Sequence, residues 1–69
     1  MIDVFTLRPG DRLLLQGKIV AEVTENMEDG MWVMVRYIEV PGKPDDVGLV
    51  ELCHAQDMVK VLGRGDAPG

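Results

Sequence analysis

The sequence predicts an all-β fold, a single small barrel of five strands with a short 3-10 turn before the last strand. Three observations support this expectation. Short stretches rich in aliphatic and β-branched residues recur along the chain, turn signals with Gly or Pro separate them, and a helix is hard to place. Closing five strands into a barrel would also remove the exposed edges that invite aggregation.

Turn signals divide the chain into its expected elements. Pro9-Gly10 precedes the first strand, Gln16-Gly17 separates the first from the second, and Asp29-Gly30 closes the hairpin before the third. These pairs suit tight turns because Pro presets φ and Gly accepts positive φ. The expected strands are 12–15, 18–25, 31–40, 47–53 and 58–62, and the 3-10 turn is expected at 54–57. A helix over 49–61, which contains neither Pro nor Gly, is the main rival to the last two strands.

The chain is expected to form one domain over residues 1–62, followed by a flexible tail at 63–69 without an anchoring apolar residue. A chain of 69 residues buries only about 60% of its unfolded surface, so stability is marginal and self-association would add to it. Aromatic residues make up 4% of the chain, which predicts an aliphatic core.

The numbers of cysteine and histidine residues limit which disulfides and metal sites the chain can form. Cys53 and His54 are the only residues of their types, so one chain assembles neither a disulfide nor a four-ligand zinc site. We therefore expect no metal, no cofactor and a reducing, cytoplasmic location. The N-terminus lacks the cationic start and apolar run of a signal peptide, and no stretch approaches the roughly 20 apolar residues of a membrane span.

The net charge is −5, from 12 acidic and 7 basic residues. Nucleic-acid binding needs clustered Lys and Arg, whereas the basic residues here are scattered singly, so the charge disfavours DNA and RNA. A one-sided basic patch would have to be assembled by folding, from Arg8, Arg12, Arg36 and Lys60. An acidic surface suits a basic protein partner, although it also simply keeps a small protein in solution.

The third expected strand carries apolar residues on both faces. Alternation places Val33, Val35 and Tyr37 on one face, and Trp32, Met34, Arg36 and Ile38 on the other. A chain this short has little material to cover both faces, and Trp, Met and Arg are enriched at interfaces. We therefore expect a partner or oligomer interface at Trp32, Met34, Arg36 and Ile38, with ordinary core packing as the alternative.

Cys53, His54 and Asp57 are the residues whose types most suggest chemistry, since such a set can form an activated nucleophile or part of a metal site. However, neighbours in a strand point to opposite faces. The favoured interpretation is therefore a buried Cys53 followed by a turn in which His54 and Asp57 satisfy backbone groups. No catalytic residue is assigned.

The order of these parts resembles small SH3-like barrels of the KOW and Tudor-like bacterial types. The matching pieces are Leu7–Leu14, Gly17–Val20, Asp29-Gly30, Val50–Leu52 and Gln56–Lys60. The resemblance covers residues 6–62 and implies an architecture rather than an activity.

We expect a non-catalytic binding or assembly module that self-associates and has an unidentified protein partner. One alternative is a nucleic-acid- or ribosome-associated barrel of the KOW kind. The other is a small oligomeric enzyme with a site at the subunit interface, where symmetry copies of Glu51 or His54 would line a central cavity.

Overall fold

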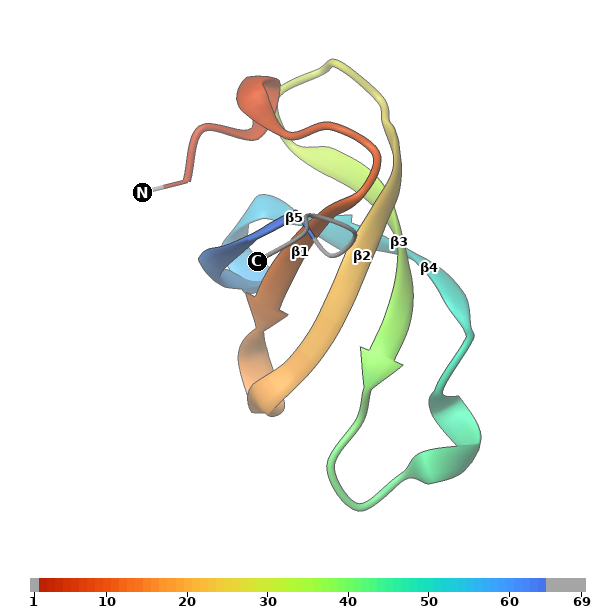
Figure 1. The fold of residues 1–69 in the computed structure, drawn as a ribbon. Coiled ribbons are helices and arrows are strands. Elements are labelled where there is room, and N and C mark those ends of the chain that lie inside the picture. The colour runs from red at the N-terminus through yellow and green to blue at the C-terminus, as the bar shows by residue number, and fades with distance from the viewer. Residues whose placement is uncertain (1, 65–69) are drawn as a thin grey trace.

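The computed structural model of the protein describes residues 2–64 and contains one antiparallel sheet of five strands (Figure 1). The strands are β1 (Asp11–Leu15), β2 (Ile19–Asn26), β3 (Trp32–Glu39), β4 (Val50–His54) and β5 (Met58–Arg64). Short 3-10 turns lie at η1 (Val4–Thr6), η2 (Gln16–Lys18), η3 (Pro44–Asp46) and η4 (Ala55–Asp57). The expected all-β class, strand number and 3-10 turn before the last strand are confirmed, and β4, η4 and the start of β5 occupy 50–61 in place of the rival α-helix.

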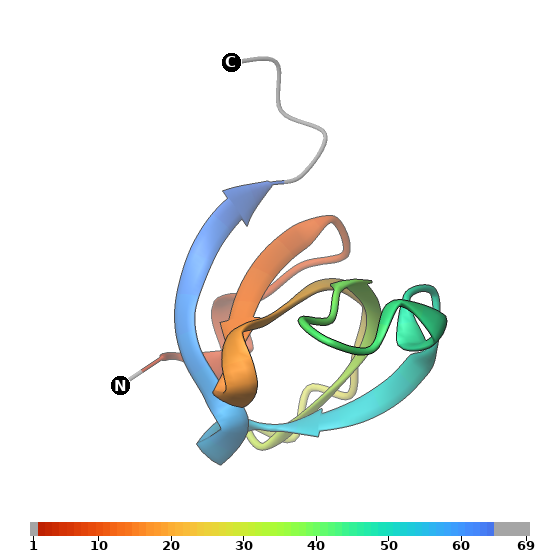
Figure 2. The same cartoon turned by 90° about the horizontal axis from the view of Figure 1, so that it is seen from below.

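The sheet has the order β4-β3-β2-β1-β5, which makes β4 and β5 its two edges. It is strongly curved, and β4 continues into β5 through η4 at one corner (Figure 2). Within residues 2–64 no ladder joins β4 to β5, so the sheet is not closed. Both edges therefore keep one side without a strand partner in that part of the chain.

The core fills the inner face of the curved sheet. Val33 and Val35 of β3 are 0% exposed, and they pair with Cys53 and Glu51 of β4 and with Asn26 and Val23 of β2. The buried set is aliphatic apart from Cys53: Val4, Leu7, Leu13, Leu15, Ala21, Val23, Val33, Val35, Cys53 and Met58. The face of β3 that carries Val33 and Val35 is thus the core face.

The N-terminal segment is held against the end of β2 by one side chain. Asn26 Nδ2 donates to the carbonyls of Val4 at 2.8 Å and Leu7 at 2.9 Å, and Asn26 Oδ1 accepts from the Glu28 N–H at 2.8 Å. These bonds place Val4 and Leu7 at the core, where both are buried.

At the other end of the chain, β5 continues through Gly63 and Arg64, beyond the expected domain end at residue 62. The rest of the expected tail, residues 65–69, lies outside the described residues.

Candidate interaction surface

The four residues predicted for an interface lie on the outer face of the sheet, opposite the core. Trp32 is 37% exposed, Met34 and Ile38 are half-buried, and Arg36 is exposed. Since Val33 and Val35 alternate with them and are fully buried, the outer face of β3 is the uncovered one.

Trp32 has one aromatic neighbour, across the sheet on β4. Its ring meets the His54 ring edge to face, with centroids 4.7 Å apart and an interplanar angle of 82°. His54 is in turn held by the backbone of the following turn, because His54 Nδ1 accepts a hydrogen bond from the Gln56 N–H at 3.0 Å. The acceptor role of Nδ1 places the proton of the neutral ring on Nε2. Trp32 therefore packs against a side chain whose orientation is fixed by the η4 turn.

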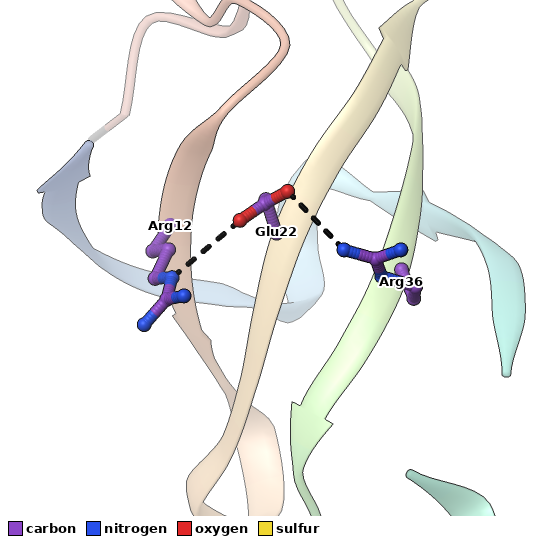
Figure 3. Close-up of polar contacts among 3 residues, drawn as sticks. All are labelled: Arg12, Glu22 and Arg36. Atoms are coloured by element: carbon purple, nitrogen blue, oxygen red, sulfur yellow. Dashed lines mark ion pairs between the residues drawn. The ribbon is translucent and has the colours of Figure 1, made fainter. Parts of the chain in front are cut away.

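Arg36 belongs to an ion triad across three strands (Figure 3). Glu22 on β2 lies between Arg12 on β1 and Arg36 on β3, with Nε–Oε1 and Nη2–Oε2 distances of 3.6 Å and 3.5 Å. Half-exposed pairs of this kind each contribute roughly 0–1 kcal/mol. The triad places two guanidinium groups on either side of one carboxylate on the outer face.

β4 extends the apolar part of this face with residues that were not predicted to belong to an interface. Met34 pairs with Leu52, and Arg36 pairs with Val50. Leu52 is 55% exposed and Val50 is exposed to a similar extent. We call Trp32, Met34, Val50 and Leu52 the outer patch. The fourth strand carried a signal in the sequence that would have identified these two residues. Val50 and Leu52 alternate with the buried Cys53, so this strand too has apolar residues on both faces.

Cys53, His54 and Asp57 do not form a joint reactive site. Cys53 pairs with Val33 on the core face, whereas His54 pairs with Trp32 on the outer face. Burial, and to a smaller extent the charge of Asp57, raises the pKa of the Cys53 thiol to about 11. The thiol donates to the His54 carbonyl, with an Sγ–O distance of 3.6 Å. A thiol held in its protonated form is a poor nucleophile.

A cavity of about 220 Å³ opens at one end of the sheet, where Leu15, Ile19, Tyr37 and Asp57 are among its lining residues. Burial, followed by the charge of Glu51, raises the pKa of the Tyr37 hydroxyl. This volume is below the roughly 300–1,000 Å³ typical of small-molecule sites. Among residues 2–64, no group of three or more His, Cys, Asp or Glu side chains could hold a metal ion.

Three of the arginines in residues 2–64 lie beside carboxylates. Arg12 and Arg36 flank Glu22, whereas Arg8 lines a separate groove together with Glu25 and Glu28. None of the helical turns in residues 2–64 is long or apolar enough to cross a membrane.

Comparison with known proteins adds no further constraint: no family model, no curated protein and no solved structure matches this chain.

Proposed function

We propose that this chain is a non-catalytic binding and assembly module with the architecture of an SH3-like barrel, and that it self-associates through the outer patch. The observation that carries the proposal is the contrast between the two faces of β3. Val33 and Val35 on the inner face are 0% exposed, whereas Trp32 on the outer face is 37% exposed and shares that face with two exposed aliphatic side chains of β4, Leu52 opposite Met34 and Val50 opposite Arg36.

The chemistry of the outer face fits an interface between proteins. Trp, Met and Arg are enriched in such interfaces, and energetically dominant residues are often Trp or Arg. Here Trp32 and Met34 lie on the same strand face as Arg36, whose guanidinium is already oriented by Glu22. The net charge of −5 suits a basic protein as a further partner.

The architecture is supported by the strand order β4-β3-β2-β1-β5, the curvature of the sheet and η4 before the last strand (Figure 2). A cytoplasmic location is part of the proposal and rests on a single cysteine, which lies in the core.

The two alternatives have less support. A nucleic-acid interface would use Arg12 and Arg36, but Glu22 lies between their side chains. An enzyme using Cys53 would need a thiolate, which the raised pKa of Cys53 opposes. An enzyme built from copies of Glu51 or His54 would first require an assembly.

Sedimentation equilibrium at several concentrations tests the proposal. The wild-type protein is expected to exceed the mass of one chain as its concentration rises, and Trp32→Ala is expected to lower the apparent mass. Phe5→Ala is the matched control, because Phe5 is a 67% exposed aromatic residue outside the outer patch. A wild-type protein that is monomeric at every concentration would refute self-association.

A further inference from the structure

The two edges of the sheet differ in how well they could accept another strand. β5 shows two register irregularities against β1, between Arg12 and Leu13 and between Leu14 and Leu15, and it carries Lys60. Bulges and edge lysines are two of the devices by which proteins discourage edge-to-edge pairing. β4 has neither: it pairs with β3 in unbroken register, and its sequence, Val50–His54, contains no Lys or Pro.

Two backbone hydrogen bonds show which residues of β4 face its open side. The Tyr37 N–H donates to the Leu49 carbonyl at 2.9 Å, and the Ala55 N–H donates to the Met31 carbonyl at 2.8 Å. In an antiparallel ladder, residues that bond the partner strand alternate with residues that do not. Residues 51 and 53 therefore direct their backbone groups to β3, and Val50, Leu52 and His54 direct theirs to the open edge.

We propose that a second copy of this chain adds to this edge, with the two β4 strands antiparallel about a twofold axis through Leu52. This inference rests on the proposed self-association and specifies its geometry. Leu52 then pairs with Leu52 of the partner subunit, and Val50 pairs with His54 of the partner subunit. All three residues have their backbone groups on the open side, so each pair can exchange two hydrogen bonds.

Charge disfavours one of the two neighbouring registers. Shifting the axis to Glu51 would place the two Glu51 carboxylates directly opposite each other, and like charges in that position are destabilising. With the axis at Leu52, Glu51 instead lies opposite the partner's Cys53, which is uncharged while its pKa remains high.

The pairing also completes the outer patch. Met34 already lies beside Leu52, so the dimer would contain one continuous apolar row, from Met34 through both Leu52 side chains to the partner's Met34. Trp32 packs against His54 in the next row of side chains on this face. In the dimer it would cover the pair that His54 forms with the partner's Val50. Apolar cross-strand neighbours are the unit of sheet stabilisation.

The size of the contact predicts a weak dimer. A standard interface of roughly 800 Å² per partner would occupy about one-sixth of this protein's exposed surface of 4625 Å². A strand of five residues is only about 17 Å long. Two paired β4 strands would therefore bury less surface per partner than a standard interface does. Dimerisation is therefore expected to be weak, and the concentration series should extend to about 1 mM, where a Kd of 1 mM gives half-occupied sites.

Two measurements on the full chain test the pairing. In sedimentation equilibrium, Leu52→Lys is expected to weaken dimerisation at least tenfold, because the twofold axis brings two ammonium groups together. Val59→Lys on β5 should leave it unchanged and is a matched control, since Val59 is 50% exposed and Leu52 is 55% exposed. Equal weakening by both substitutions would overturn the inference.

Amide hydrogen exchange gives a readout that does not depend on a variant. The amides of Val50, Leu52 and His54 should become slower to exchange as the concentration rises, whereas those of Glu51 and Cys53 should be protected throughout. If the protein dimerises but these three amides exchange at a rate independent of concentration, the β4 pairing is wrong and the proposed self-association stands. A protein that never dimerises overturns both.

Discussion

Asn26 offers the sharpest test of how the N-terminal segment is held, through the substitution Asn26→Ala. This change removes three hydrogen bonds, two donated to the Val4 and Leu7 carbonyls and one accepted from the Glu28 N–H. A typical internal hydrogen bond contributes roughly 0.5–1.5 kcal/mol, so the free energy of unfolding should fall by about 2–4 kcal/mol. Small domains are stabilised by only about 5–15 kcal/mol in total, so this is a large fraction.

Urea unfolding followed by Trp32 fluorescence measures the effect. With an m-value of roughly 1 kcal/mol/M for a small protein, the midpoint should move down by about 2–4 M. Thr24→Ala is the control, because Thr24 is an exposed residue of the same strand and should change stability by less than about 0.5 kcal/mol. A loss below about 0.5 kcal/mol in Asn26→Ala would show that this amide does not hold the segment.

Two further predictions concern the core and the β2–β3 loop. Burial raises the pKa of Cys53 from 9.0 to about 11, so its stabilising contribution is complete below pH 9 and is lost as the pH rises toward 11. Thermal stability should therefore fall between pH 9 and 11 less steeply in Cys53→Ala than in the wild type, and equal slopes would contradict this. Gly30 has φ +81°, and a Cβ there would lie 2.8 Å from the Phe5 ring, so Gly30→Ala should lower the free energy of unfolding by about 1–3 kcal/mol. Adding Phe5→Ala should recover part of that loss in urea unfolding, and no recovery would mean that the ring simply moves aside.

Alternation divided the residues of β3 between two faces correctly, because successive residues of a strand point to opposite sides, but it left open which face is the core. Val33 and Val35 are the buried members, and Trp32 is the exposed one. The start of the fourth strand was expected at Val47 but lies at Val50. The carbonyl of Asp46 accepts the Leu49 N–H at 3.1 Å, so a turn holds the chain up to that residue.

The burial of Val4 and Leu7 was not predictable from the pattern. Two apolar residues in a short N-terminal segment are too few to show a periodic pattern. The residue that hydrogen-bonds to their carbonyls, Asn26, lies 19 to 22 residues away in the sequence. For a related reason, the sequence predicted only two of the four residues of the outer patch. Trp32 and Met34 stood out by type, whereas Val50 and Leu52 are ordinary strand residues until the pairing with β3 places Leu52 opposite Met34 and Val50 opposite Arg36.

By itself, the sequence determined the all-β class and an aliphatic core with one thiol. It also determined a third strand that carries apolar residues on both of its faces. These properties depend on composition and on a period of two residues, which are local. Only the tertiary structure decided that, within residues 2–64, β4 and β5 are the edges of the sheet and no ladder joins them, and that Val50 and Leu52 lie on such an edge. The physical reason is that strand order and register arise from contacts between distant segments, which no local pattern encodes.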